Sequence, residues 1–198
     1  MVLEPGNDEL AALQLNCPVL ETQRLILRPP HETDAEDIAE LANNYRVASM
    51  LATMPHPYFV ADARDFLTKF GQAKPGHAVY AITLKGDGSF VGVCGLHEDK
   101  NRYELPFIGY WLGEVYWGHG FASEAARALV DLFFKVTDRD EMMISCRIDN
   151  ERSRRIIEKC GGIPWKREDR YNRALGEMHA VDDFRVTRES WLKVADLS

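Results

Sequence analysis

The sequence predicts a mixed α/β (α+β) fold, built on a mostly antiparallel sheet that contains one parallel strand–helix–strand unit and is flanked by helices. Two apolar segments, 79–84 and 90–96, flank a polar, glycine-containing stretch at 85–89, which is typical of a β-hairpin. Further along, an apolar strand at 105–112 is followed by an amphipathic helix and then by a second apolar strand at 142–148. A strand–helix–strand connection of this kind places its two strands parallel. The sheet is therefore expected to be mixed.

The chain is expected to form one folded unit after a short leading segment. We predict an N-terminal extension over residues 1–19 and a single domain over residues 20–198, because 198 residues with 45% apolar and 28% charged content suit one globular core. The domain begins with a short strand at 24–28. Pro29 and Pro30 end this strand, since proline has no N–H to give to a sheet.

Two helices are expected next. Thr33 and Glu36 have the spacing of a capping box, in which each side chain hydrogen-bonds the backbone N–H of the other. Apolar residues then recur at helical spacing over 35–42, and again over 62–70. Both segments are therefore predicted as amphipathic helices.

The segment 50–59, between these helices, is not expected to be a regular helix. Pro55 and Pro57 remove the N–H groups that a helix interior needs. The segment is rich in apolar residues and proline, which leaves two interpretations. It forms a wall of a substrate channel, or it is a connecting loop held by buried Met54 and Phe59.

A glycine-containing loop at 117–122 leads into the central helix and is the expected ligand site. Gly118 and Gly120 allow the backbone to approach an anion closely, and the first N–H groups of the helix have no partner within it. The positive end of the helix dipole also favours an anion there, so the loop predicts a pyrophosphate. The apolar positions that define the helix are Ala122, Ala125, Ala126, Leu129, Val130, Phe133 and Phe134.

The same glycines also suit a tight strand-to-helix turn that binds no ligand. A P-loop needs Gly-Lys-Ser/Thr at the helix start, which is absent here. A dinucleotide fingerprint lacks its third glycine, where Ser123 stands, although Asp140 and Glu141 lie near the position of its ribose-binding acid. A nicotinamide-dependent dehydrogenase therefore remains a distant alternative, because only one parallel crossover is apparent.

The last third of the chain is expected to complete the sheet. Residues 150–160 form a short helix that Gly161 and Gly162 end. The polar segment 166–173 is a strand or a loop, and residues 179–186 form the last strand.

Composition excludes several classes of function. A net charge of −7 argues against a general nucleic-acid binder. The start of the chain has no signal-peptide pattern, and no apolar run is long enough to cross a bilayer, so we expect no membrane association and a cytoplasmic location. No Cys-x-x-Cys or clustered His and Cys pattern indicates a metal site. The cysteines expected to be reduced thiols are Cys17, Cys94, Cys146 and Cys160.

Four motifs together resemble the GNAT N-acetyltransferase family, and within it the branch of Rim enzymes that acetylate the N-termini of ribosomal proteins. The resemblance covers residues 20–191, nearly the whole chain. The family's loop consensus is Gln/Arg-x-x-Gly-x-Gly/Ala, and Trp117 replaces its first residue without disturbing the backbone amides. The motifs are residues 21–28, 108–112, 117–122 and the pair 150–153 with 158–161.

The resemblance implies a sheet splayed between its two parallel central strands, where acetyl-coenzyme A binds. The pyrophosphate would lie on the loop amides, and the pantetheine arm would pair with the splayed strand like an extra strand. Asn150 would hydrogen-bond the arm, and it is equally well suited to cap its own helix. The implied cofactor-binding residues are Trp111, Leu112, Trp117, Gly118, His119, Gly120, Phe121, Ala122, Asn150 and Ser153.

The implied reaction is direct attack of a neutral amine on the thioester in a ternary complex. An N-terminal amine has a pKa of about 8, so only modest help is needed to deprotonate it. Glu104, at the head of the central strand, is the expected base, although exposed acids often occupy such positions without a role. His97, Glu98 and Asp99 are lesser candidates.

The leaving thiolate needs a proton donor, which many family members supply from a tyrosine on the helix after the Asn. Ile157 stands at that position here, and Ser153 on the same helix is the expected donor. His119 lies in the phosphate loop, where an anion contact or a solvent position is expected rather than catalysis. Cys146 and Cys160 are interpreted as core thiols.

The expected acceptor is a primary amine, and specifically a protein N-terminal α-amine. A small amine such as a polyamine, an aminoglycoside or an amino acid would use the same cofactor residues. A non-catalytic acyl-coenzyme A sensor is an alternative of another class, favoured by the missing tyrosine and opposed by Ser153. No metal is implied, and a monomer and a homodimer are both compatible with the sequence.

Overall fold

The computed structural model describes residues 17–71, 76–99 and 103–195. The extension predicted over residues 1–19 therefore lies outside the described residues, apart from its last three.

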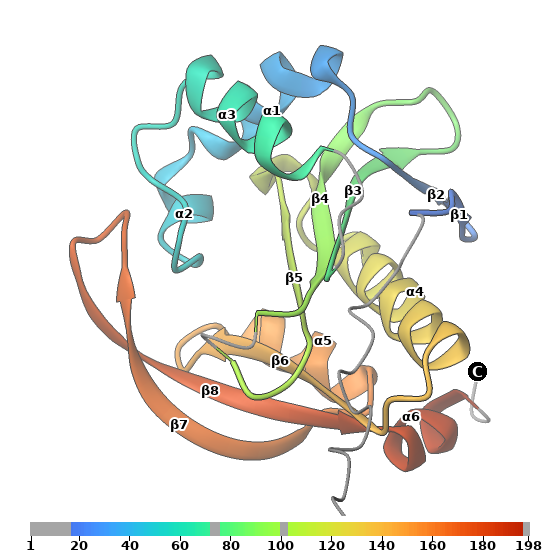
Figure 1. Cartoon of the computed structure of the whole chain (residues 1–198). Coiled ribbons are helices and arrows are strands. Elements are labelled where there is room, and N and C mark those ends of the chain that lie inside the picture. The colour runs from blue at the N-terminus through green and yellow to red at the C-terminus, as the bar shows by residue number, and fades with distance from the viewer. Residues whose placement is uncertain (1–16, 72–75, 100–102, 196–198) are drawn as a thin grey trace, which may run out of the picture.

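Eight strands form one sheet in the order β1-β2-β3-β4-β5-β6-β8-β7 (Figure 1). Every neighbouring pair is antiparallel except β5 and β6, which are parallel and are joined through a helix. The predicted mixed fold is confirmed. The strands are β1 (Leu20–Glu21), β2 (Leu25–Arg28), β3 (His77–Leu84), β4 (Phe90–His97), β5 (Phe107–Leu112), β6 (Glu141–Arg147), β7 (Ile163–Asn172) and β8 (Glu177–Thr187).

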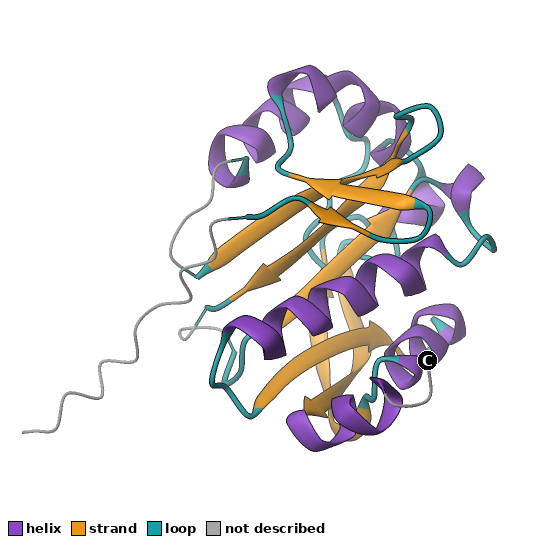
Figure 2. Ribbon diagram, turned by 90° about the vertical axis from the view of Figure 1, so that its right-hand side faces the viewer, coloured by secondary structure: helices purple, strands orange, loops and turns teal. Residues whose placement is uncertain are grey.

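Helices cover both faces of the sheet (Figures 1 and 2). Helices α4, α5 and α6 contribute to the core on one face, and α1, α2 and α3 to the core on the other. The helices are α1 (Ala35–Ala42), α2 (Tyr45–Ala48), α3 (Val60–Phe70), α4 (Phe121–Val136), α5 (Glu151–Lys159) and α6 (Arg188–Ala195), with single 3₁₀ turns η1 (Glu32–Asp34) and η2 (Glu114–Tyr116).

The continuous apolar sequence of the central strands follows from this double coverage. On β3, Tyr80 and Ile82 pack in the core beneath α4, whereas Val79 and Ala81 pack in the core beneath α1 and α3. Successive side chains of a strand point to opposite faces, so a strand that is buried on both faces has no polar alternation. Phe133 of α4 is fully buried in the first of these cores.

The start of the first helix differs from the predicted capping box of Thr33 and Glu36. A 3₁₀ turn precedes α1, and the Asp34 carboxylate accepts a hydrogen bond from the His31 N–H at 2.7 Å. Burial acts to raise the pKa of Asp34, but hydrogen bonds from Arg28 and His31 outweigh it and hold that pKa below its usual value. The ion pair with Arg28 holds the Asp34 carboxylate against the N–H of His31, at the start of the 3₁₀ turn, and the capping-box spacing does not include this pair.

The segment 50–59 is irregular, as its prolines require, but its predicted anchors are only half correct. Met54 is buried, whereas the Phe59 side chain is 60% exposed. Tyr58 is buried in place of Phe59, and its N–H donates to Oδ1 of Asn43 at 3.0 Å. Alternation in an irregular loop is not fixed by a regular period, so the sequence could not show which of the two rings points inward.

Candidate active site

The sheet is open at its centre, between the two parallel strands. β5 and β6 pair only where Phe107 meets Met143 and Ile108 meets Ile144. At the next position, Gly109, the backbone of a central strand is exposed, and a Cβ built there would meet nothing within 4 Å. The face of β5 is thus uncovered at the point where its pairing with β6 ends.

Each of the two strands keeps its other neighbour. β5 stays paired with β4 as far as Leu112, and β6 stays paired with β8 as far as Arg147. Beyond the two pairs, the edge of β5 at residues 109–112 faces the edge of β6 at residues 145–147. The backbone N–H and C=O groups along these two edges take no part in the described pairing of β5 with β6. Such an edge can pair with an extended ligand.

A tyrosine and a serine meet on the helical side of this opening. Strand alternation places Tyr110 on the face of α4 and α5, and its hydroxyl lies 2.8 Å from Oγ of Ser153 on α5. Burial raises the pKa of Tyr110, so its hydroxyl keeps its proton. Tyr110 is not among the predicted site residues, although the alternation of Ile108, Tyr110 and Leu112 could have indicated that it faces α5.

Asn150 fixes the start of α5. Its side chain accepts a hydrogen bond from the Ser153 N–H at 3.1 Å, which confirms the predicted capping role. Ile157, at the position where many family members carry a tyrosine, is fully buried in the core. Helix α5 therefore turns Ser153, and not residue 157, toward the opening.

The loop between β5 and α4 has the geometry of an anion site. Gly118 and Gly120 have φ angles of 82° and 81°, in the left-handed region that favours glycine. Among the described residues, no acceptor is found for the N–H groups of Gly118, His119 and Gly120. Consecutive N–H groups in such a turn, beside the N-terminus of α4, attract a phosphate.

Trp117 fastens this loop to the end of the strand. Its indole N–H donates to the Leu112 carbonyl at 2.9 Å, and the guanidinium groups of Arg46 and Arg152 lie over its ring at 5.7 Å and 5.5 Å. Because the Leu112 carbonyl is already engaged, the edge available to a ligand lies mainly before it. Trp111 packs in the core beneath α1 and α3.

Aromatic and small apolar side chains complete the loop. The His119 ring stacks on the Phe121 ring with their centroids 5.7 Å apart, and Phe121 and Ala122 both pack against the core beneath α4. The side chains of the loop thus turn to each other or to the core, which leaves its backbone available.

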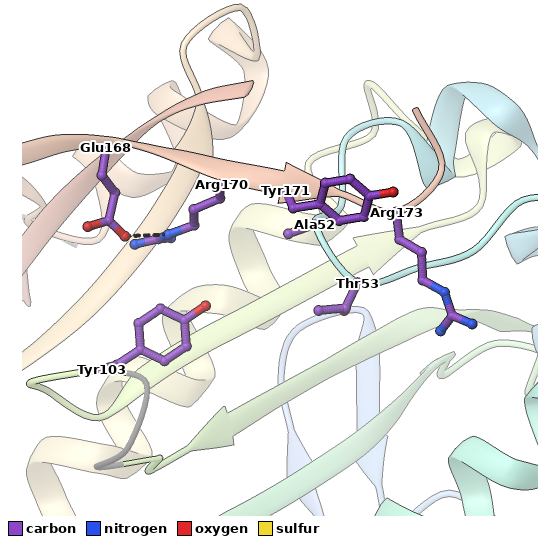
Figure 3. Close-up of a pocket in the computed structure, with 7 residues that line it drawn as sticks. All are labelled: Ala52, Thr53, Tyr103, Glu168, Arg170, Tyr171 and Arg173. Carbon is purple, nitrogen blue, oxygen red and sulfur yellow. Dashed lines mark hydrogen bonds and ion pairs between the residues drawn. The ribbon is translucent and has the colours of Figure 1, made fainter. Parts of the chain in front are cut away.

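A cleft of about 590 Å³ lies on the opposite face of the sheet (Figure 3). Hydrogen bonds hold together the segments on its two sides. The Ser49 carbonyl accepts from Nη1 of Arg147 at 2.7 Å and from Nδ2 of Asn172 at 2.9 Å, and the Ala52 carbonyl accepts from the Arg173 N–H at 2.9 Å. The residues that line the cleft are Ala52, Thr53, Tyr103, Glu168, Arg170, Tyr171 and Arg173.

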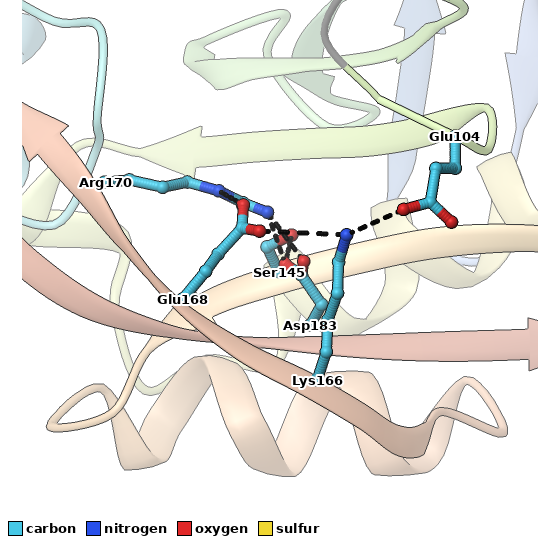
Figure 4. A network of polar contacts seen from close by, with 6 residues as sticks. All are labelled: Glu104, Ser145, Lys166, Glu168, Arg170 and Asp183. Carbon is cyan, nitrogen blue, oxygen red and sulfur yellow. Dashed lines mark hydrogen bonds and ion pairs between the residues drawn. The ribbon is translucent and has the colours of Figure 1, made fainter.

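Beside this cleft the long β7–β8 hairpin is held by a buried polar network (Figure 4). Nη2 of Arg170 lies 2.7 Å from both carboxylate oxygens of Asp183, which is fully buried, and Nε of Arg170 donates to Glu168 at 2.7 Å. Oγ of Ser145 donates to the same Asp183 at 2.6 Å. The predicted polar strand or loop at 166–173 is thus a strand as far as Asn172, and ion pairs engage its Lys166, Arg167, Glu168 and Arg170.

Glu104, the predicted base, lies outside the opening between β5 and β6. It precedes β5, before the two residues that pair with β6, and its side chain is 69% exposed. Lys166 forms an ion pair with it at 3.3 Å. The structure therefore does not bring Glu104 together with Ser153, which lies beyond the paired residues.

The lesser base candidates are engaged elsewhere. Burial lowers the pKa of His97 to about 4, and its Nδ1 lies 3.0 Å from Nδ1 of His77. Glu98 forms an ion pair with Arg139 at 2.7 Å. All four cysteines are free and buried, as was predicted of Cys146 and Cys160, and burial raises the pKa of Cys146 to about 11 and that of Cys160 to about 12. These two thiols stay protonated and unreactive.

A family model described as an acetyltransferase (GNAT) domain matches residues 24–163. The match spans the opening, the loop and the whole of α5, and it covers more than half of the chain. The chain belongs to the GNAT acetyltransferase family. It is an acetyl-coenzyme A-dependent N-acetyltransferase, which overturns the dehydrogenase alternative.

Individual relatives agree with this assignment. The acetyltransferase is 29% identical to the uncharacterized N-acetyltransferase p20 of Bacillus licheniformis, over 87% of this chain and 97% of that protein. It is 30% identical to the ribosomal-protein-serine acetyltransferase of Escherichia coli, over 44% of this chain and 49% of that protein. The coenzyme A complex of RimL, a ribosomal L7/L12 alpha-N-protein acetyltransferase, has the same fold with a TM-score of 0.69 and 21% identity, over 88% of this chain and 98% of that one.

The described part of the acetyltransferase contains neither a membrane span nor a metal cluster. None of its helices is long and apolar enough to cross a bilayer. Within residues 17–71, 76–99 and 103–195, no three His, Cys, Asp or Glu side chains gather as they would around a metal ion.

Replacing Asp183 by Ala tests the network that holds the hairpin. The substitution leaves the Arg170 guanidinium buried without its carboxylate, so we expect the unfolding free energy to fall by about 3–5 kcal/mol in urea denaturation. Glu189→Ala, which removes an exposed ion pair with Lys193, is the matched control and should change little. Equal stability of the two variants would contradict the structural role of Asp183.

Replacing Gly120 by Glu tests the loop. The new side chain is strained at a φ of 81° and places a carboxylate beside the expected pyrophosphate, so we expect the Kd for acetyl-coenzyme A to rise at least about 100-fold in calorimetry. Gly88→Glu is the matched control, because Gly88 has a φ of 77° in the β3–β4 turn and open space around it. Wild-type affinity of the Gly120→Glu variant would refute the loop as the pyrophosphate site.

Proposed function

We propose that the acetyltransferase binds acetyl-coenzyme A on the face of α4 and α5, with the pyrophosphate on the amides of residues 118–122. The N–H groups of Gly118, His119 and Gly120, which have no acceptor within the described residues, support this placement, as does the left-handed backbone at both glycines. The pantetheine arm lies along the open edge of β5 at residues 109–112, toward the Asn150 and Ser153 end of α5. The thioester then reaches the opening between β5 and β6.

The acceptor amine enters from the opposite face, and the observation that carries this proposal is the exposed backbone at Gly109. Because the sheet is open at that point, a group in the cleft lined by Tyr103 and Tyr171 can reach the thioester through the sheet. The absence of a Cβ at Gly109 leaves room for the two reacting atoms to meet.

The acceptor is a protein N-terminal α-amine. Two related proteins are named for acetylation of ribosomal proteins, which supports a chain end as the acceptor. The cleft is also open to solvent, since Tyr171 and Arg173 on its rim are both exposed, and an open cleft accepts the end of a longer chain. With a pKa of about 8, an α-amine is partly neutral at physiological pH, unlike a lysine amine at about 10.4.

Ser153 supplies the proton that the leaving sulfur needs. The amine nitrogen attacks the thioester carbon, the C–N bond forms, the C–S bond breaks, and the thiolate takes the Ser153 hydroxyl proton. Tyr110 lies 2.8 Å from that hydroxyl and orients it through a hydrogen bond, while its own burial keeps its proton in place. Water from the open cleft returns the proton to Ser153 after the coenzyme A thiol forms. Glu104 takes the proton of the attacking amine through water, since its carboxylate is exposed and lies outside the opening.

A peptide panel tests the acceptor. We expect acetylation of a peptide with a free N-terminus, and none of the same peptide with a formylated N-terminus and an internal lysine, with the site mapped by mass spectrometry. The physical reason is the difference in pKa between the two amines. Acetylation of spermidine, an aminoglycoside or free amino acids, without any acetylation of peptides, would assign the enzyme to small amines.

Replacing Ser153 by Ala tests the proton donor. We expect kcat to fall about 10- to 100-fold with little change in the Kd for acetyl-coenzyme A, because the backbone cap with Asn150 is kept. Tyr110→Phe should lower kcat less. Tyr80→Phe is the control, because it also removes a buried tyrosine hydroxyl but on β3, and it should leave kcat unchanged. An unaltered rate in the Ser153→Ala variant would leave Ser153 with the structural role alone.

A further inference from the structure

The N-terminal motif at residues 21–28 has no part in the reaction described so far, yet it is fastened to the start of α4. Nε and Nη2 of Arg24 lie 2.8 Å and 2.7 Å from Oε2 of Glu124, and the Arg24 N–H donates to Oε1 at 2.7 Å. The Thr22 hydroxyl donates to Oε1 as well, at 2.6 Å. Glu124 thus receives bonds from both the backbone and the side chain of a segment that is 100 residues away in the sequence.

Arg24 also holds the phosphate loop itself. Its Nη1 donates to the His119 carbonyl at 2.8 Å. In a trans peptide the C=O of one residue and the N–H of the next point in opposite directions. A carbonyl of His119 that is held toward Arg24 therefore directs the Gly120 N–H to the other side, away from the guanidinium.

The guanidinium lies closely against the loop on a further side. It stacks on the Phe121 ring with 4.7 Å between the guanidinium carbon and the ring centroid. Its Nη2 would lie 3.3 Å from a Cβ built on Gly120. The Arg24 side chain is 45% exposed, so one part of it fills the space beside the loop and another part faces solvent.

The negative charge of Glu124 explains why a guanidinium is needed beside the loop. Its side chain is only 14% exposed and lies in the first turn of α4, beside the place where a pyrophosphate would lie. Burial acts to raise the pKa of Glu124, but hydrogen bonds from Thr22 and Arg24 outweigh it and lower that pKa, so the carboxylate is charged. Without a cation beside it, this carboxylate would repel a bound diphosphate.

We propose that Arg24 is a positioning residue for the pyrophosphate of acetyl-coenzyme A, acting through the loop and Glu124. It orients the His119–Gly120 peptide so that an N–H faces the anion, and it neutralises the acid in the first turn of α4. This inference rests on the proposed placement of the pyrophosphate at residues 118–122. The proposal gives the motif at residues 21–28 a role in cofactor binding.

A comparison of two acetyl donors, acetyl-coenzyme A and S-acetyl-pantetheine, separates this role from a general effect on folding. We expect Arg24→Gln to raise the Kd for acetyl-coenzyme A about tenfold, measured by calorimetry, which corresponds to about 1.4 kcal/mol. The Kd for S-acetyl-pantetheine, which lacks the pyrophosphate and the nucleotide, should stay within about twofold of wild type in ligand-observed NMR. Equal losses for both ligands, or no loss for either, would overturn the proposal.

Arg139→Gln is the matched control. It removes the same charge from another partly buried ion pair, that with Glu98, beyond the opposite end of α4, and it should leave both dissociation constants unchanged. The Gly120→Glu variant keeps the two levels of inference apart. If that variant loses acetyl-coenzyme A and Arg24→Gln does not, only the role of Arg24 fails; if both bind normally, the placement of the pyrophosphate fails.

A double variant tests the contribution of charge and guards against misfolding of the single variant. In Arg24→Gln with Glu124→Gln, the repelling carboxylate is absent, so the Kd for acetyl-coenzyme A should return to within about threefold of wild type. An identical loss in the single and double variants would overturn the neutralising role. Far-UV circular dichroism and thermal melting of each variant establish that the compared proteins are folded.

Discussion

The brevity of the parallel pairing between β5 and β6 is the constraint on which the rest of the acetyltransferase depends. The two strands share only two residue pairs, and beyond these their facing edges diverge in the middle of the sheet. Buried backbone groups need partners, so such a break is stable only if the strands are held from outside and the gap is open to water or a ligand. β4 holds β5 as far as Leu112, and the β7–β8 hairpin holds β6 through β8. The exposed backbone of Gly109 lies where this pairing ends.

Polar contacts between distant segments fix the two sides of this opening. Trp117 and Arg24 hold the loop at residues 117–122 from the strand end and from the first motif, while Arg170 and Asp183 stiffen the hairpin beside the cleft. Each contact joins residues from different elements, and the guanidinium groups form bonds that a lysine could not form in the same geometry. The reacting region therefore owes its shape to side chains that need not touch either substrate.

Periodicity and glycine placement predicted most of the fold and the turn at residues 117–122, because both are local properties. Helix α4, the strands of the hairpin and the parallel unit followed from apolar spacing, and Gly118 and Gly120 have the left-handed backbone that their position in the loop implied. Contacts made by folding could not be predicted in this way. The Asp34 carboxylate pairs with Arg28 and accepts a hydrogen bond from the His31 N–H at the start of the 3₁₀ turn before α1, and Tyr110 meets Ser153 only because β5 and α5 pack together. The exposure of Glu104 likewise depends on the course of the loop before β5, and local sequence patterns do not specify that course.

The outermost strand bears on self-association. β7 lies at the edge of the sheet, and an unpaired edge of ten residues is a template on which a second chain could add its own strand. Residues 166–170 of this strand read Lys-Arg-Glu-Asp-Arg, so an incoming strand would have to strip water from a row of charges of both signs. The charged residues that stiffen the hairpin thus also oppose the addition of a strand from a second chain. An apolar edge strand at this position would instead favour aggregation.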